Sequence, residues 1–139
     1  MSRESNIQAV KRGYEAFGRG DLNTLLDLFS DDIEWITPGP QELATSGRRR
    51  GRQQVAEFFR LVNESFEFHN FEPRTFVADD TRVIVLGVDE VTFRATGVRL
   101  PVIDWVHVFT FTNDTVTHFE EIFDASVIVA QLEAAKART

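Results

Sequence analysis

One run of β-branched and aromatic residues, residues 102–111, constrains the fold of this chain more than any other segment. It contains no Gly or Pro, and its composition is typical of a β-strand. Because side chains alternate between the two faces of a strand, His107 shares a face with aromatic neighbours. That face carries Ile103, Trp105, His107, Phe109 and Phe111, and the other carries Val102, Asp104, Val106, Val108 and Thr110. An imidazole among aromatic rings is shielded from water and can exchange protons near neutral pH. If the chain has a chemical centre, we expect it at His107.

The composition narrows the class of protein. The 139 residues suffice for one domain with a sizeable core, and 42% hydrophobic with 27% charged residues is ordinary for a globular protein. Thirteen Phe against one Tyr indicate a dry, aromatic interior. The net charge of −7 argues against nucleic-acid binding. The absence of cysteine excludes disulfides and thiolate zinc sites.

Membrane insertion and secretion are not expected from the sequence. No apolar run approaches the roughly 20 residues of a membrane span. Residues 1–10 are polar and lack the apolar core of a signal peptide. We therefore expect a cytoplasmic protein.

Helical periodicity dominates the first half of the chain. It predicts a helix over residues 5–17, where Ser5 with Gln8 fits a capping box. Asp21 fits the N-cap of a second helix, whose apolar stripe consists of Leu22, Leu25, Leu26 and Phe29. A turn at residues 30–32 and a short strand at residues 33–36 follow. Residues 37–51, rich in Pro and Gly, predict a loop, and residues 53–66 predict a third helix.

The second half of the chain predicts strands. They cover residues 68–78, 81–93, 98–111 and 115–123, and a terminal helix capped by Asp124 or Ser126 follows. Helices followed by antiparallel strands place the chain in the α+β class. A curved sheet wrapped around the helices would form a cone with an interior pocket.

Several segments, in order and with sensible spacing, carry a family resemblance. They are residues 10–22 (VKRGYEAFGRGDL), residues 28–35 (LFSDDIEW), residues 47–51 with Val55, Phe58 and Phe59, residues 105–109 (WVHVF) and residues 118–124 (HFEEIFD). In these segments the chain resembles the SnoaL-like, polyketide cyclase-like branch of the nuclear transport factor 2-like superfamily, which is related to the ketosteroid isomerases. The resemblance implies a cone-shaped α+β barrel in which three N-terminal helices pack on a curved, mostly antiparallel sheet. This fold hosts isomerases, dehydratases, cyclases, epoxide hydrolases and binding modules.

The residues of the steroid isomerases are only partly present. Their general base, an Asp before a Pro, corresponds to Thr37, which has no useful basicity near pH 7. Their oxyanion-hole Tyr corresponds to Gly13, with Tyr14 one residue away and turned by about 100° around the helix. Their second oxyanion acid corresponds to His107. The resemblance therefore does not imply a steroid isomerase of the known type.

Three residues are candidates for catalysis. His107 is the candidate proton carrier, although a strand histidine can also be a satisfied core residue. Glu121 shares a face with Phe119 and Phe123 in the last strand, and a carboxylate between two Phe needs a partner, so it is the expected partner of His107 unless it lies at the sheet rim. Tyr14 is the candidate hydrogen-bond donor to an oxyanion. Asp104 is expected on the opposite face.

Aromatic residues are the candidate ligand contacts, although core packing explains each of them equally well. They are Trp35, Phe58, Phe59, Trp105, Phe109 and Phe119. The basic run of Arg48, Arg49, Arg50 and Arg52 is either a solvated loop or a group that steers an anionic substrate. No metal site is expected, because His69, His107 and His118 lie on different strands and no zinc or calcium motif is present.

Two functions fit these observations. The first is a cofactor-independent isomerase, dehydratase or cyclase that acts on a small apolar carbonyl or hydroxylated compound. The second is a binding or dimerisation domain without catalysis, which the Thr at position 37 favours. In either case the family implies a homodimer through the outer sheet face, where Val102, Val106, Val108 and Ile122 would supply apolar surface.

Overall fold

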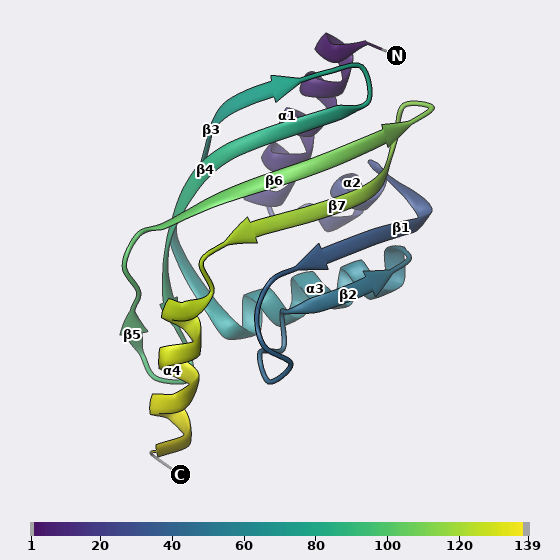
Figure 1. Cartoon of the computed structure of the whole chain (residues 1–139). Coiled ribbons are helices and arrows are strands. Elements are labelled where there is room, and N and C mark those ends of the chain that lie inside the picture. Colours follow the sequence, from purple (N-terminus) through teal and green to yellow (C-terminus); the bar gives the residue numbers. More distant parts are fainter. Residues whose placement is uncertain (1, 138–139) are drawn as a thin grey trace.

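The computed structural model describes residues 2–137, and its helices precede most of its strands (Figure 1). The helices are α1 (Arg3–Gly18), α2 (Leu22–Leu26), α3 (Arg52–Ser65) and α4 (Ser126–Ala137). The strands are β1 (Phe29–Thr37), β2 (Gly47–Arg50), β3 (Phe66–Ala78), β4 (Arg82–Phe93), β5 (Val98–Arg99), β6 (Ile103–Thr112) and β7 (Thr115–Phe123). Within the described range, no helix has the length and apolar character that crossing a membrane requires.

The strands form one mixed sheet in the order β2-β1-β7-β6-β4-β3, and β5 pairs with β4. All neighbouring strands are antiparallel except β1 and β7. The sheet is strongly curved and unclosed, and α1 and α3 cover its concave side, so that sheet and helices enclose a conical interior (Figure 1). The predicted cone-shaped α+β fold is confirmed.

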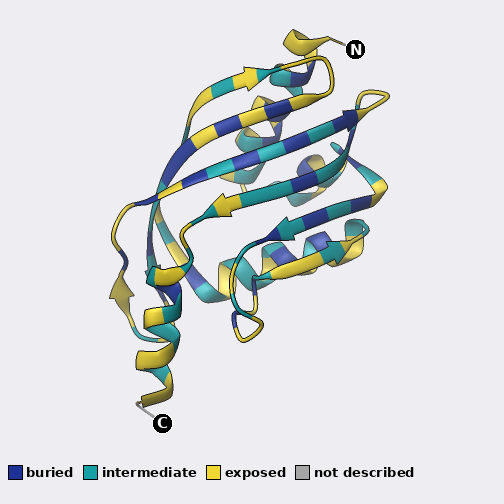
Figure 2. Cartoon of the chain, in the orientation of Figure 1, coloured by how far each residue is buried: buried dark blue, intermediate teal, exposed yellow. Residues whose placement is uncertain are grey.

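Burial alternates along β6 as the sequence predicts (Figure 2). Trp105 and His107 are buried on the concave face, whereas Asp104 is exposed on the outer face. The regular register of β6 with β4 and with residues 118–123 of β7 keeps this alternation intact. The structure therefore confirms that Asp104 points away from the interior.

The first two helices differ from the prediction at their ends. Ser2, rather than Ser5, is the N-cap of α1, and Ser2 and Ser5 together form the capping box. The second helix ends at Leu26, and Phe29 begins β1 instead of completing an apolar helical stripe. The carbonyl of Phe29 accepts two hydrogen bonds from Arg52, at 2.9 and 2.6 Å, which fixes the backbone in the sheet. The turn expected at residues 30–32 therefore lies within β1.

Two further elements differ from the prediction. The expected loop at residues 37–51 contains β2, which pairs with the last residues of β1. The strand expected at residues 98–111 is divided into β5 and β6. The break falls at residues 100–102 because Pro101 has no N–H to donate to a neighbouring strand.

Candidate functional site

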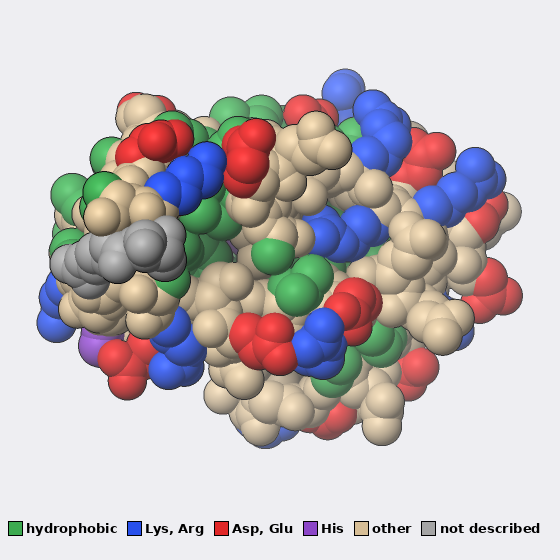
Figure 3. All heavy atoms as spheres, turned by 90° about the horizontal axis from the view of Figure 1, so that it is seen from below, with side chains coloured by type: hydrophobic (Ala, Val, Ile, Leu, Met, Phe, Trp, Pro, Cys, Tyr) green, Lys and Arg blue, Asp and Glu red, His purple; other side chains and the backbone are tan. Residues whose placement is uncertain are grey.

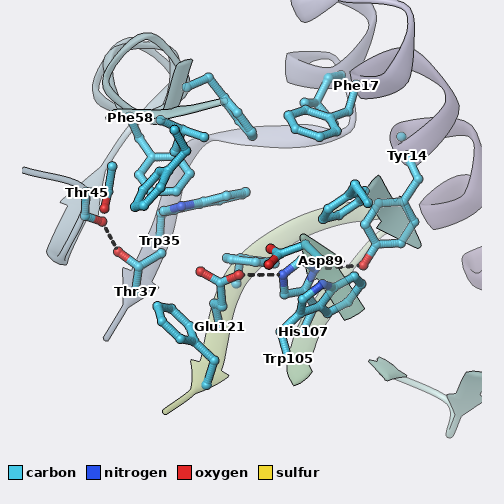
Figure 4. Close-up of a pocket in the computed structure, with 18 of the residues that line it drawn as sticks. Tyr14, Phe17, Trp35, Thr37, Thr45, Phe58, Asp89, Trp105, His107 and Glu121 are labelled. Atoms are coloured by element: carbon cyan, nitrogen blue, oxygen red, sulfur yellow. Dashed lines mark hydrogen bonds and ion pairs between the residues drawn. The ribbon is translucent and has the colours of Figure 1, made fainter. Parts of the chain in front are cut away.

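A cavity of about 120 Å³ lies inside the cone, between α1, α3 and the concave face of the sheet (Figure 4). Apolar and aromatic side chains form most of its wall. The exceptions with acidic, hydroxyl or imidazole groups are Tyr14, Thr37, Thr45, Asp89, His107 and Glu121. Ile128 on α4 also lines the cavity, and Figure 3 shows hydrophobic side chains in a recess beside this helix, with charged side chains around it.

Tyr14, His107 and Glu121 form one hydrogen-bonded line across the cavity wall (Figure 4). The Tyr14 hydroxyl lies 2.8 Å from Nδ1 of His107, and Nε2 of His107 lies 2.9 Å from Oε2 of Glu121. His107 and Glu121 are direct partners in the β6–β7 register, and Tyr14 reaches them from α1. The side chain of His107 is 8% exposed and that of Glu121 is 20% exposed. The structure thus brings together the three residues that the sequence analysis selected for catalysis.

The direction of these hydrogen bonds depends on the hydrogen atoms that His107 and Tyr14 carry. Burial, and secondarily the negative charge of Glu121, raise the pKa of Tyr14 above its usual value. Tyr14 therefore remains a phenol. In the tautomer of His107 that carries its hydrogen on Nε2, the phenol donates to Nδ1 and the Nε2–H donates to Glu121. Protonation of His107 at Nδ1 reverses the first bond, because the imidazolium then donates to the phenol oxygen. The phenol hydrogen is then free to be donated into the cavity.

Aromatic stacking fixes the orientation of the imidazole. The ring of Trp105 lies nearly parallel to that of His107, with 3.9 Å between centroids and 19° between planes. Phe71 stacks on Trp105 in turn, at 5.1 Å and 12°. Across the cavity, Trp35 stacks on Phe119 at 3.8 Å. All six aromatic residues expected to contact a ligand lie in this wall: Trp35, Phe58, Phe59, Trp105, Phe109 and Phe119.

The sequence analysis missed Asp89, which lies in the same wall on β4. Figure 4 shows its carboxyl group directed toward that of Glu121. Its Oδ1 is buried and has no hydrogen-bond partner among residues 2–137. Burial, followed by the negative charge of Glu121, raises the pKa of Asp89 to about 7. Alternation along β4 puts Asp89 on the same face as the buried Val83 and Val85, and this signal was available in the sequence.

Thr37, which the sequence resemblance matches to the general base of the steroid isomerases, lies in the cavity wall. Its hydroxyl donates to the carbonyl of Thr45, so it ties the end of β1 to the segment that precedes β2. Arg49 holds the same segment from β2 by donating to the carbonyl of Ala44 at 2.6 Å, and its guanidinium lies 5.2 Å from the centre of the Phe58 ring.

The basic run is part of the folded structure rather than of a free loop. Arg48 pairs with Glu34 at 3.5 Å, and Arg52 pairs with Asp31 at 3.3 Å. None of its Arg residues is among those that line the cavity. In the part of the chain that the structure covers, no group of three His, Asp or Glu side chains has an arrangement that could hold a metal ion.

Known structures of the same shape include proteins with substantial sequence identity. A nuclear transport factor 2-like protein from Burkholderia xenovorans is 35% identical, with a TM-score of 0.84 over 94% of this chain and 97% of that chain. A similar protein of unknown function from Burkholderia pseudomallei is 32% identical, with the same TM-score and coverage. TerC, co-crystallised with polyporic acid, is 30% identical, with a TM-score of 0.79 over 95% of this chain and 98% of that chain.

Sequence comparison agrees with this structural similarity. Uncharacterized proteins of Mycobacterium tuberculosis and Mycobacterium bovis are 39% identical over 44 residues, which is 32% of this chain and 34% of theirs. The matched part is therefore about a third of the length of those relatives. The model of the SnoaL-like domain matches residues 10–119, which is most of the chain. The chain therefore belongs to the SnoaL-like domain family, within the nuclear transport factor 2-like superfamily.

Proposed function

We propose that this protein catalyses cofactor-independent proton transfer on a small, largely apolar carbonyl or hydroxylated compound. The observation that carries the proposal is the hydrogen-bonded line of Tyr14, His107 and Glu121 in an otherwise apolar wall. Residues of this kind, held away from water, are suited to isomerisation, dehydration or aldol-type cyclisation.

The three residues act together on the oxygen atom of the substrate. Glu121 holds His107 by its Nε2–H and compensates the charge of the imidazolium. Protonated His107 donates to the phenol oxygen of Tyr14, and Tyr14 donates its own hydrogen to the substrate oxygen on which negative charge develops. A proton can thus pass from His107 to the substrate through one hydroxyl group.

The aromatic wall indicates the shape of the substrate. Trp35 and Trp105 both line the cavity, where Trp35 stacks on Phe119 and Trp105 stacks on His107. The wall therefore consists largely of flat aromatic rings. An aromatic or alicyclic ring system would complement such surfaces. TerC, at 30% identity, was co-crystallised with polyporic acid, which supports a ring-containing ligand for this fold.

A second function, binding without catalysis, has support from one position. Thr37 stands where the isomerases have their base, and its hydroxyl donates to a backbone carbonyl. A domain that holds an apolar ligand would need neither that base nor a proton path.

The two functions are separated by an assay that requires no natural substrate. The probe is 2-tetralone, an enolisable ketone, whose α-proton exchange in D₂O is followed by NMR. We expect the protein to accelerate exchange, His107→Gln to slow the accelerated rate by about 10²–10⁴-fold, and Tyr14→Phe to slow it by about 10²-fold or more. Asp104→Asn, on the outer face of the same strand as His107, is the matched control and should exchange at the normal rate.

Each result has a defined meaning. Exchange at the normal rate by folded His107→Gln would show that the proposed proton path is wrong. If the wild-type protein does not accelerate exchange but 2-tetralone raises its melting temperature, binding without catalysis is the better description.

We also propose that the protein is a homodimer formed through the outer face of the sheet. Leu86, Val106 and Ile122 are register partners on β4, β6 and β7, so they form an apolar row across the outer face. Leu86 is 44% exposed and Ile122 is 50% exposed. A second copy of the chain would cover this row.

A further inference from the structure

We propose that Asp89 is the group that takes a proton from the substrate carbon, and that the cavity accepts a neutral, enolisable carbonyl compound rather than a carboxylate. This inference rests on the acid–base function proposed above. The line of Tyr14, His107 and Glu121 serves the substrate oxygen, and it leaves the proton on carbon without an acceptor. Thr37 cannot be that acceptor, because its hydroxyl group has no useful basicity near pH 7.

The position of Asp89 in the sheet directs its carboxyl group into the cavity. It follows Val85 and Gly87 on the concave face of β4 and pairs with Ile103 of β6. Gly87 has no side chain, and the ring of Trp105 occupies the space above it. Figure 4 shows the carboxyl group of Asp89 directed toward that of Glu121.

The two carboxyl groups have different surroundings. Glu121 accepts a hydrogen bond from His107, whereas Oδ1 of Asp89 has no partner within the described residues. When two carboxyl groups face each other in different environments, their pKa values separate. One group stays ionised, and the other can take up and release a proton. The other titratable groups in the cavity wall are Tyr14 from α1, His107 from β6 and Glu121 from β7. With a pKa raised to about 7 by burial and by Glu121, Asp89 is half ionised near neutral pH.

The proposed step balances without any co-reactant. The Asp89 carboxylate takes an α-proton from the ketone, and the electron pair of that C–H bond becomes the C=C bond of the enol. The C=O electrons move to oxygen, which receives the hydrogen of Tyr14. If the proton on Asp89 is first replaced by a deuteron from solvent, delivery of that deuteron to the same carbon gives exchange, whereas delivery of the proton to a conjugated carbon gives isomerisation. In both cases the enol oxygen returns its hydrogen to Tyr14 as the C=O bond forms again. Nothing is oxidised or reduced.

The charges in the cavity favour a neutral substrate. No Lys or Arg of the described chain is among the residues that line the cavity. A substrate carboxylate would therefore lie near the charge of Glu121 without a cation to compensate it, and above pH 7 near the charge of Asp89 as well. A ketone or an enol avoids this repulsion, and an enol hydroxyl can donate to the ionised Asp89.

The catalytic part is tested with Asp89→Asn in the 2-tetralone exchange assay. We expect the variant to lose about 10²–10⁴-fold of the accelerated rate while it remains folded. In the wild-type protein, the rate should rise with pH up to about pH 7 as Asp89 ionises. Asp104→Asn, the same substitution on the exposed face of the sheet, should keep both the rate and the pH profile. Exchange by Asp89→Asn at the normal rate would overturn the assignment of Asp89 and leave the role of His107 standing.

A binding experiment tests Asp89 independently of catalysis. The probes are 2-naphthol, a neutral enol analogue, and 2-naphthoate, an anion of similar size, each titrated calorimetrically at pH 8. We expect the wild-type protein to prefer 2-naphthol and Asp89→Asn to reduce this preference by roughly tenfold, because one negative charge is removed. An unchanged preference in Asp89→Asn would overturn the contact between Asp89 and the ligand. A reduced preference without 2-tetralone exchange by the wild-type protein would support that contact and overturn the proton transfer.

Discussion

At the scale of single residues, the ionisation of Asp89 lowers the free energy of unfolding. The carboxyl is buried in an apolar wall, so the folded state holds its proton up to a pH of about 7, compared with an ordinary value of 3.8. Between these values the unfolded chain releases the proton and the folded chain keeps it. Stability therefore falls as the pH rises through this range and levels off above pH 7.

Asp89→Asn should remove this pH dependence. Between pH 5.5 and pH 8.5, we expect the free energy of unfolding of the wild-type protein to fall by about 2 kcal/mol more than that of the variant. Urea titrations at the two pH values measure the difference, and the lower value stays above the isoelectric point of 4.9. Equal changes with pH in the two proteins would mean that Asp89 is not buried in this way.

At the scale of elements, β4 and β6 position the site through one residue that lacks a side chain. A Cβ atom at Gly87 would lie 2.3 Å from Cζ2 of Trp105 and 2.6 Å from the carbonyl oxygen of Glu72. One of these neighbours is a ring that supports His107, and the other is the backbone of β3. The close approach of three strands at this point therefore requires glycine.

Gly87→Ala should displace Trp105 and the imidazole stacked on it. We expect a loss of about 1–3 kcal/mol in stability and a change in tryptophan fluorescence. Gly18→Ala is the control, because a Cβ atom at Gly18 meets no other atom within 4 Å. Thermal denaturation and emission spectra of the two variants measure the contrast. A Gly87→Ala protein with normal stability and emission would contradict the close packing described.

The segment before β2 illustrates how one arginine can organise an element. Arg49 donates to the carbonyls of Ala44, Thr45 and Ser46 and lies over the ring of Phe58. Thr45 in turn accepts the hydrogen bond of Thr37. The basic run therefore shapes one wall of the cavity through Arg49, although no arginine lines the cavity.

At the scale of the whole molecule, the two faces of the sheet carry different kinds of side chain. The concave face holds the aromatic wall and the titratable groups of the cavity, and the outer face of the central strands holds the row of Leu86, Val106 and Ile122. A monomer would leave this row in water. A second copy of the chain, related by a two-fold axis, would cover it.

The homodimer is tested by placing charge on this row. We expect the wild-type protein to sediment as a dimer and Leu86→Lys with Ile122→Lys to sediment as a folded monomer. The control is Lys11→Ala with Arg12→Ala, on α1 rather than on the outer sheet face, and this variant should remain dimeric. Analytical ultracentrifugation measures both, and a monomeric wild-type protein at high concentration would contradict the proposal.

The sequence determined the local features of this protein. Helical periodicity located α1 and α3, and strict alternation along residues 103–111 assigned His107 to the interior and Asp104 to the exterior, because side-chain direction in a strand depends only on position. The same rule put Glu121 on the face of Phe119, and a buried carboxylate needs a partner, so its pairing with His107 was predictable.

Only the tertiary structure decided the remaining features. Phe29 has a helical spacing from Leu25 and Leu26, but hydrogen bonds from the distant Arg52 place it in β1. The short β2 exists because β1 offers an edge, which no local pattern reveals. The carboxyl groups of Asp89 and Glu121 are far apart in the chain, and the curvature of the sheet brings them to one cavity. Which groups face each other depends on long-range strand order and curvature, whereas which face a group occupies depends on its own strand.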